Sequence, residues 1–372
     1  MSDHYLMTPA GKPRARALGI PLLGAPGPTN AITDVAGVEV GMATLIRGAA
    51  VRTGVTVIHP RGPSGSPDPV AAGFHAQNGN GEMTGVSWIH ESGTFAGPVG
   101  ITSTGAVGVV HAAINAWVAD HHPQMAEAWV LPVVGETWDG YLHDINGQHV
   151  TAALARDALD GSSGGPVEEG SVGGGTGMTC YQYKGGSGTA SRRVVVAGRA
   201  VTVGVFLQAN FGRRAELTVA GVPLGLELSD DNPMAIQSAT PAGAGSVIAV
   251  AATDAPLLPG QLEAMARRVP MGLARTGTTG SHFSGDLCLA FSTANPGAFV
   301  PQKRPGGLGR LDFLPWEVMD PLFAAVVYAT EEAVLNALVA NDPMTGRDGH
   351  VAPALPRDRV AARFGGQPRH HG

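Results

Sequence analysis

Cysteine is scarce in this chain of 372 residues, in which Cys180 and Cys288 are the only two. Neither lies in a CxxC pair, and a disulfide framework needs more, so the sequence favours a reducing compartment and a cytoplasmic protein. Long apolar runs are missing too, because no stretch reaches the roughly 18 uncharged apolar residues that a membrane span needs. The basic residues within 1–19 lack a following apolar segment. We therefore expect neither a secretory signal nor a membrane partner.

Charged residues are also few. They make up 15% of the chain against 44% hydrophobic residues, which leaves little polar surface for a protein of this length. This balance predicts a homo-oligomer, in which the protein buries part of its surface against copies of itself. With a formal net charge of −6 and no block of Lys and Arg residues, the sequence argues against a nucleic-acid partner.

The patterns of metal and phosphate sites are absent as well. The 13 histidines form no HExxH motif, and His121 and His122 are adjacent, so their side chains project differently. The stretch 173–178 is rich in glycine but lacks the lysine of a phosphate-binding loop, and we interpret it as a place of close backbone or substrate approach. We expect no metal and no other cofactor.

Glycine and proline, with 54 and 28 residues, are plentiful but follow no period, which excludes collagen-like and repeat architectures. Strand-like runs alternate with helical patterns, as in an α/β protein. The strand-like runs are residues 54–60, 128–137, 192–198, 201–210, 246–254 and 286–293. The helical patterns are residues 107–121, 147–161, 259–276 with a break at Pro270, and the evenly apolar 316–341. Long loops are expected at 159–192 and 227–245.

Five small residues, 242–246, precede an apolar run, and a flexible turn is their simplest interpretation. The alternative is a self-cleavage site, in which the Ser246 hydroxyl attacks the carbonyl of Gly245. An N→O acyl shift and hydrolysis would then leave Ser246 as a new N-terminus, whose α-amino group, with a reference pKa of about 7.7–8.0, can act as a base. Glycine on the acyl side tolerates a twisted backbone and allows close approach.

Further positions carry chemistry that such a nucleophile needs. Ser284 and Asp286 are two apart in an extended stretch, so both side chains point to one face, where they can orient a nucleophile. Asn210 ends an apolar run and can donate to a developing oxyanion. Glu136 ends another run and can hold a substrate ammonium. Ordinary polar turns and solvated strand-end charges remain the alternative at all of these positions.

Taken together, the motifs resemble the L-aminopeptidase/D-esterase family, which includes the β-peptidyl aminopeptidases. The resemblance spans nearly the whole chain, with the motifs in the family's order. The matching segments are residues 79–85, 133–140, 170–178, 185–192, 208–214, 245–262 and 284–293.

The resemblance implies a single domain over residues 1–372, an α/β protein built as a four-layer αββα sandwich. Its layers are similar to those of N-terminal-nucleophile (Ntn) hydrolases, but its connectivity differs. The resemblance also implies self-cleavage between Gly245 and Ser246, which yields an α-chain of residues 1–245 and a β-chain of residues 246–372, and assembly as a homotetramer.

Carried over residue by residue, the resemblance makes Ser246 the nucleophile, Ser284 and Asp286 its supporting pair and Asn210 the oxyanion donor. Glu136 would grip the N-terminal ammonium of a small peptide or of an aminoacyl amide or ester. Trp138 is expected beside Glu136 in the substrate-binding pocket, and it is also a departure from the family, because some relatives carry at this position a tyrosine that assists the oxyanion. The indole has one donor and no proton to give away, and Tyr141 would not point the same way on a regular backbone.

Three functions compete. The first is a self-processing serine aminopeptidase that acts on peptides, amides or esters. The second is an acyltransferase of the ornithine acetyltransferase type, whose nucleophile is a threonine in a different motif, so that Ser246 argues against it. The third is an uncleaved, non-enzymatic binding protein of the same fold.

Overall fold

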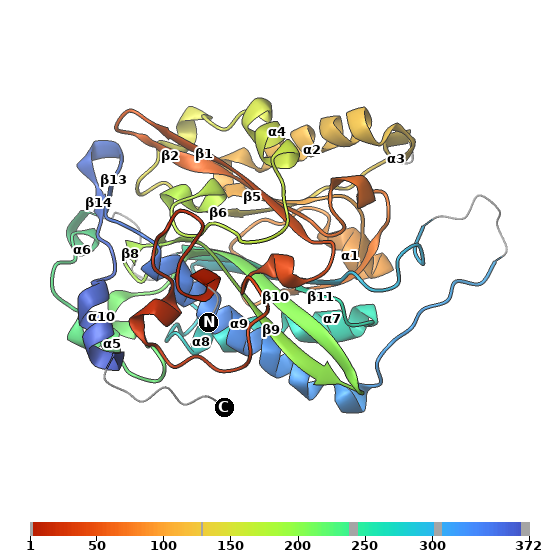
Figure 1. The fold of residues 1–372 in the computed structure, drawn as a ribbon. Helices are drawn as coiled ribbons and strands as arrows, with labels where there is room; N and C mark the ends of the chain where they lie inside the picture. Colours follow the sequence, from red (N-terminus) through yellow and green to blue (C-terminus); the bar gives the residue numbers. More distant parts are fainter. Residues whose placement is uncertain (1–2, 128, 238–244, 301–306, 366–372) are drawn as a thin grey trace.

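The computed structural model describes residues 3–127, 129–237, 245–300 and 307–365. Two main β-sheets form its centre (Figure 1). The four-stranded sheet has the order β1 (Glu39–Arg47), β2 (Val51–His59), β5 (Val99–Ser103) and β6 (Val133–Thr137). The six-stranded sheet has the order β4 (Thr94–Phe95), β3 (Val70–Ala76), β12 (Ser284–Ser292), β11 (Gly245–Thr253), β10 (Arg199–Asn210) and β9 (Gly186–Val196).

The inner faces of the two sheets meet in a shared apolar core. Ile58 and Ile101 of the four-stranded sheet pack in one cluster with Phe206, Ile248 and Leu289 of the six-stranded sheet, and all five are fully buried. Strands covered on both faces need apolar residues at nearly every position, which explains the continuous apolar run in β11. The core thereby holds β11 in a defined register between β10 and β12.

Helices cover the outer faces (Figure 1). Helices α2 (Val107–His121) and α4 (Ala152–Asp160) pack on the four-stranded sheet. Helices α7 (Pro259–Ala266), α8 (Val269–Ala274) and α9 (Asp320–Val339) lie on the side of the six-stranded sheet. The remaining elements are short: α1 (Val86–Ser92), α3 (Pro123–Glu127), α5 (Leu224–Glu227), α6 (Met234–Gln237), α10 (Arg357–Phe364) and the two-stranded pairs β7 (Thr179–Cys180) with β8 (Tyr183–Lys184) and β13 (Met344–Thr345) with β14 (Val351–Ala352).

The predicted helices are all present. The helix over 107–121 has the expected bounds, and the break at Pro270 is confirmed, because α7 ends at Ala266 and α8 begins at Val269. The helix expected at 147–161 starts later, at Ala152, since the hydroxyl of Thr151 accepts the backbone N–H of Leu154 and caps it there.

The loop predicted at 159–192 is wrong over residues 186–192, which belong to β9. The glycines that suggested a loop instead let α9 lie against the backbone of this strand. A Cβ on Gly188 would come within 2.0 Å of the carbonyl oxygen of Ala333 in α9. In the second predicted loop, 227–245, the structure contains the short helix α6, and residues 238–244 lie outside the described residues.

The glycines of 173–178 have the predicted role of allowing close approach. Residues 173–177 form a buried 3₁₀ turn, and a Cβ on Gly174 would lie 2.3 Å from the side-chain oxygen of Gln208 and 2.7 Å from the carbonyl oxygen of Ile101. This turn therefore packs directly against both main sheets.

Helix α9 is long and apolar enough to cross a membrane by length and composition, which the sequence reading did not anticipate. However, 78% of its most apolar 18-residue window is buried inside the protein. A buried core helix meets the same criteria, and burial is what the even apolarity of 316–341 predicts.

Candidate active site

Ser246 is the second residue of β11, and two neighbouring strands determine its surroundings. It lies opposite Asn210, the last residue of β10, and beside Gly285 of β12. Side chains alternate along a strand, so Ser246 shares a face with Ile248 and points toward the core between the sheets. Its exposed fraction is 2%.

The hydroxyl oxygen of Ser246 accepts two hydrogen bonds from groups far away in the sequence. The carboxamide Nδ2 of Asn210 donates to it at 3.3 Å, and the backbone N–H of Trp138 donates at 3.2 Å. Nδ2 also donates to the carbonyl oxygen of Trp138 at 2.8 Å, while Oδ1 accepts the backbone N–H of Thr179 at 3.0 Å. This arrangement leaves one orientation for the carboxamide, with its donors toward Ser246.

Ser284 and Asp286 form the pair that their spacing predicts. The hydroxyl of Ser284 donates to Oδ1 of Asp286 at 2.5 Å. Asn78, which the sequence reading missed, donates from Nδ2 to Oδ2 of Asp286 at 3.0 Å, and its Oδ1 accepts the backbone N–H of Asp286. Burial raises the pKa of Asp286, and these hydrogen bonds oppose that rise.

The pair lies beside the backbone of Ser246 rather than at its hydroxyl. Ser284 faces Gly245 in the parallel register of β11 and β12, and Ser246 faces Gly285. Since side chains alternate, Ser284 and Asp286 occupy the face of the sheet opposite to the Ser246 hydroxyl. They are therefore placed next to the Gly245–Ser246 peptide.

Glu136 lies near the end of β6, two residues before the Trp138 N–H that reaches the nucleophile. Its Oε1 accepts the backbone N–H of Glu82 at 3.0 Å, and its Oε2 accepts the hydroxyl of Thr104. Burial raises the pKa of Glu136, although both hydrogen bonds favour the ionised form. A buried carboxylate without a cationic partner is suited to bind an ammonium group.

The backbone at Gly81 lies between Glu136 and the strand that carries Ser284. A Cβ on Gly81 would lie 3.4 Å from Oε1 of Glu136 and 3.0 Å from Cα of Gly285. The glycine-rich motif 79–85 therefore fits between the two carboxylate-bearing parts of the site, and a larger residue at Gly81 would push them apart.

The side chain of Trp138 takes no part in the hydrogen bonds around Ser246, because the backbone N–H of Trp138 donates to Oγ of Ser246 and its backbone C=O accepts from Nδ2 of Asn210. The ring packs over Gly140, whose added Cβ would meet it at 2.4 Å. Tyr141 points elsewhere, as expected, and donates its hydroxyl to the side chain of Gln237 at 2.8 Å. Neither side chain therefore supplies the oxyanion group of a tyrosine at position 138.

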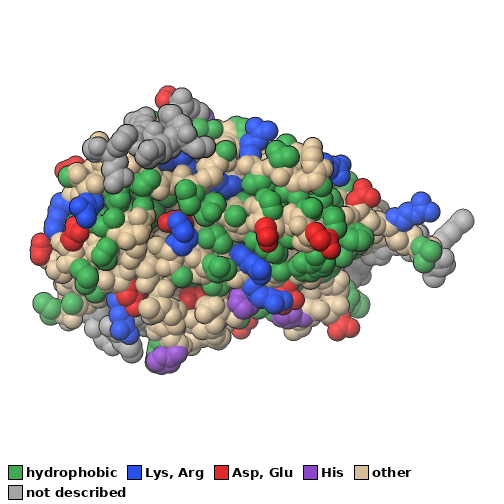
Figure 2. Space-filling model, turned by 90° about the horizontal axis from the view of Figure 1, so that it is seen from below, with side chains coloured by type: hydrophobic (Ala, Val, Ile, Leu, Met, Phe, Trp, Pro, Cys, Tyr) green, Lys and Arg blue, Asp and Glu red, His purple; other side chains and the backbone are tan. Residues whose placement is uncertain are grey.

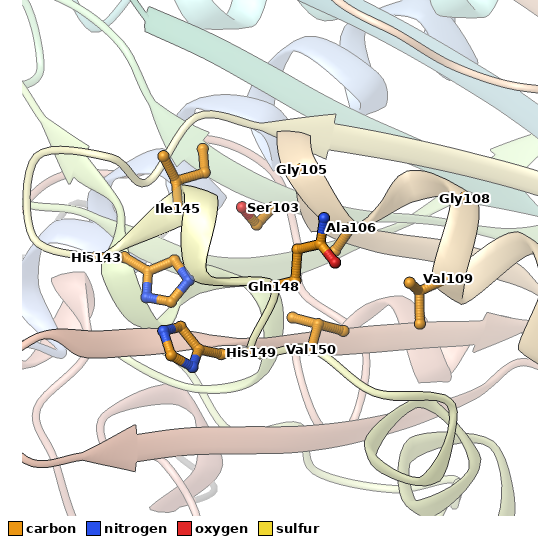
Figure 3. A pocket seen from close by; sticks show the side chains of 10 residues that line it. All are labelled: Ser103, Gly105, Ala106, Gly108, Val109, His143, Ile145, Gln148, His149 and Val150. Carbon is orange, nitrogen blue, oxygen red and sulfur yellow. The ribbon is translucent and has the colours of Figure 1, made fainter.

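A pocket of about 240 Å³ lies beside the turn Thr104–Ala106, whose first residue hydrogen-bonds Glu136 (Figure 3). Ser103 and Gly105, the neighbours of Thr104, line it together with His143 and His149. Burial is the largest cause that lowers the pKa of His143, to about 4. None of the residues predicted for the site, Ser246 included, lines this pocket.

Within the described residues, no group of three or more His, Cys, Asp or Glu side chains is placed to hold a metal ion.

The groups that the sequence patterns did not reveal, namely Asn78, Thr104 and the backbone N–H of Trp138, act through long-range hydrogen bonds. The sequence marks two of them only by their position. Asn78 directly precedes the motif 79–85, and Trp138 lies within the motif 133–140.

Comparison with known proteins supports these motifs over the length of the chain. The profile of peptidase family S58 matches residues 30–352. Two curated relatives, both named beta-peptidyl aminopeptidase BapA, are 47% identical (Sphingosinicella microcystinivorans) and 46% identical (Sphingosinicella xenopeptidilytica). The alignments cover 94% and 95% of this chain and 91% and 92% of the relatives, respectively.

Solved structures agree. The L-aminopeptidase D-Ala-esterase/amidase of Ochrobactrum anthropi, described as a prototype of the serine aminopeptidases and a variant of the Ntn hydrolase fold, matches with a TM-score of 0.89 and 45% identity. A beta-aminopeptidase of a Burkholderia species matches with a TM-score of 0.86 and 43% identity, and each match covers 95% of this chain and 99% of the other. The protein is thus a mixed α/β hydrolase of the Ntn type, and the chain belongs to peptidase family S58.

Proposed function

We propose that this protein is a self-processing serine aminopeptidase, which removes N-terminal residues from peptides, amino-acid amides or esters through an acyl-enzyme on Ser246. The observation that carries the proposal is the Ser246 hydroxyl, which is buried at a strand end beside two N–H donors, from Asn210 and Trp138. The names of the S58 relatives support an aminopeptidase activity.

Self-cleavage begins when Oγ of Ser246 attacks the carbonyl carbon of Gly245. The C–N bond breaks, the new α-amine takes the hydroxyl proton, and water hydrolyses the resulting ester to a Gly245 carboxylate and a free hydroxyl. The packing supports glycine at this position, because a Cβ on Gly245 would lie 2.3 Å from the carbonyl oxygen of Asn210. The products are the chains 1–245 and 246–372.

In turnover, the new α-amine takes the proton of the Ser246 hydroxyl and later returns it to the leaving amine. Ser284 and Asp286, next to the peptide that becomes this terminus, hold the amine in place. Nδ2 of Asn210 and the N–H of Trp138 stabilise the oxyanion of the tetrahedral intermediate.

Glu136 selects substrates with a free N-terminus, because it pairs with their ammonium group in a buried site. An acetylated N-terminus lacks this charge and would leave the carboxylate unpaired. Selection of this kind produces an exopeptidase rather than an endopeptidase.

The same proposal covers the assembly. The two sheets with a helical layer outside each form a four-layer αββα sandwich in one domain, as the apolar clusters support. Hydrophobic side chains gather on the face that carries α8 and α9 (Figure 2). Large exposed apolar residues, among them Met271, Phe313 and Trp316, support a homotetramer. We place the enzyme in the cytoplasm because of its two buried free cysteines.

Intact-mass spectrometry of the wild-type protein beside Ser246→Ala tests the proposal. The wild type should give two fragments that meet at Gly245/Ser246, and the variant one intact chain without hydrolysis of β- or α-aminoacyl amides. Turnover that persists in Ser246→Ala would overturn the assignment of the nucleophile. A wild-type chain that stays intact after prolonged incubation would overturn self-processing.

A further inference from the structure

Lys184, in β8, is a fully buried lysine outside the set of residues that touch the nucleophile. Its Nζ donates to the carbonyl oxygen of Met178 at 2.7 Å and to that of Gly185 at 2.8 Å. No carboxylate among the described residues forms an ion pair with it, whereas the other fully buried cation, Arg192, pairs with Glu332 at 2.6 Å. Burying a cation without a counter-ion is costly, so a compensating role is expected.

The peptide group between Met178 and Thr179 connects Lys184 to the site. The carbonyl that accepts Nζ belongs to Met178, and the N–H of the same peptide group, that of Thr179, donates to Oδ1 of Asn210 at 3.0 Å. The carboxamide of Asn210 then donates from Nδ2 to Oγ of Ser246. Two amide groups therefore stand in series between an ammonium group and the nucleophile.

Hydrogen bonds in such a series strengthen one another. An amide whose oxygen accepts a hydrogen bond from a cation becomes a better donor at its nitrogen. Both amides are polarised in the same sense, which favours negative charge at the position of Oγ. The series also fixes the Asn210 carboxamide, because Thr179 holds its oxygen from the side that Lys184 anchors.

The surroundings of Lys184 permit both of its protonation states. Its pKa is lowered to about 7, mainly by burial and to a lesser extent by the nearby Lys12, while Cys180 and Asp139 act in the opposite direction. A neutral amine still carries two N–H donors, enough for both carbonyls, so the connection persists when the proton is lost.

We infer that Lys184 is a positioning residue for the oxyanion donor, which acts on Ser246 through the Met178–Thr179 peptide and the carboxamide of Asn210. The inference rests on the proposed function, since it assigns the support of that same site. Lys184 contacts neither Ser246 nor Asn210 directly, so its effect should depend entirely on the presence of the Asn210 side chain.

A double-mutant cycle tests this dependence. Lys184→Met should lower kcat for an aminoacyl amide about 10-fold with KM changed less than about twofold, because the interaction serves the transition state. In the Asn210→Ala background, the same change should lower kcat less than about twofold, since its target is gone. Lys184→Arg, which keeps charge and donors, should recover most of the rate.

Arg214→Met is the matched control. Arg214 is also buried and donates to the carbonyls of Tyr181 and Gln182, on the same segment, but not to the Met178–Thr179 peptide. Its removal should affect thermal stability without the selective loss in kcat. Lys184→Gln, a shorter neutral donor, replaces Lys184→Met in the cycle if the latter does not fold.

Two outcomes would overturn the inference: losses from Lys184→Met and Asn210→Ala that multiply in the double variant, or a loss in Arg214→Met equal to that in Lys184→Met. A wild type that hydrolyses no aminoacyl amide would refute the proposed function instead. In that case, the crystal structure of Lys184→Met tests the positioning role by itself. A carboxamide of Asn210 that has rotated away from its wild-type orientation would support this role. A retained bond between Thr179 and Asn210 at its wild-type length contradicts it.

Discussion

Asn210 and Ser246 face each other across two antiparallel strands, so that the carboxamide Nδ2 lies 3.3 Å from the hydroxyl oxygen of Ser246. Both residues are at strand ends, where the pairing of β10 with β11 determines their separation. A donor held in this way needs no reorganisation when negative charge develops, which is the condition for effective oxyanion stabilisation.

Asn210→Ala should therefore lower kcat by about 100- to 1000-fold, the usual cost of removing one oxyanion donor. KM should change little, because the lost interaction is made mainly in the transition state. Steady-state kinetics with an aminoacyl p-nitroanilide measures both values. Asn295→Ala is the control, since the half-buried Asn295 lies in a surface turn, where its side chain hydrogen-bonds the backbone of Asp312. A KM effect larger than the kcat effect would instead indicate a substrate-binding role for Asn210.

Glu136→Gln should reduce kcat/KM for substrates with a free N-terminus by about 10- to 100-fold, because a charge-assisted interaction worth about 1.5–3 kcal/mol is lost. The shape of the side chain is conserved in this variant, and both partners can be kept when the amide oxygen accepts the Glu82 N–H and the amide nitrogen donates to the Thr104 hydroxyl, so the fold should persist. Glu82→Gln is the control, because the backbone N–H that Glu82 donates to Glu136 is kept, while the negative charge of Glu82, which adds to burial in raising the pKa of Glu136, is removed. Equal losses for both variants would show that general charge, rather than the Glu136 carboxylate, attracts the substrate.

Gly245→Ala should block or strongly slow self-cleavage. The added Cβ would lie 2.3 Å from the carbonyl oxygen of Asn210 and 2.8 Å from Cα of Phe211, so β11 must move away from β10 and carry Ser246 with it. Gel electrophoresis over time measures the fraction of intact chain. Gly260→Ala is the control, because its added Cβ meets nothing within 4 Å. In this variant, cleavage between Gly245 and Ser246 should proceed at the wild-type rate. Wild-type cleavage in Gly245→Ala would contradict the requirement for close packing at the scissile residue.

Asp139 should make stability depend on pH. Burial raises its pKa from 3.8 to about 7, against the hydrogen bond from Ser103, and its Oδ2 has no hydrogen-bond partner among the residues that the structure describes. Between about pH 4 and 7 the unfolded chain is ionised at this position and binds fewer protons than the folded one. The free energy of unfolding contributed by Asp139 is therefore greatest below pH 4 and is lost as the pH rises through about 7.

Asp139→Asn removes this titration, because an amide keeps the acceptor for Ser103 but cannot ionise. Chemical denaturation between pH 4 and 8, in the uncleaved Ser246→Ala background, should show a smaller decline of stability with pH than in the parent. Asp120→Asn is the control, since its carboxylate is exposed and forms a surface pair with Arg156. An unchanged pH dependence in Asp139→Asn would mean that Asp139 is already ionised in the folded protein.

Local patterns predicted most of the elements because they record burial. The apolar residues of α2 and β11 are spaced as a covered helix and a covered strand require, and both elements occur where they are predicted. The start of β9 was missed for the same reason. Its glycines allow α9 to pack against the backbone, so the strand shows no apolar alternation between 186 and 191.

The sequence by itself determined the class of fold and the family, since these follow from periodicity and from motifs in order, and it predicted the residues that we propose carry the chemistry. Only the tertiary structure decided how they meet. In the structure, the N–H of Trp138 donates to Ser246, and Asn78 donates to Asp286. Lys184 binds the Met178–Thr179 peptide that in turn holds Asn210. Hydrogen bonds between distant segments depend on strand register and sheet packing to within a fraction of an ångström, and no local sequence pattern encodes that distance.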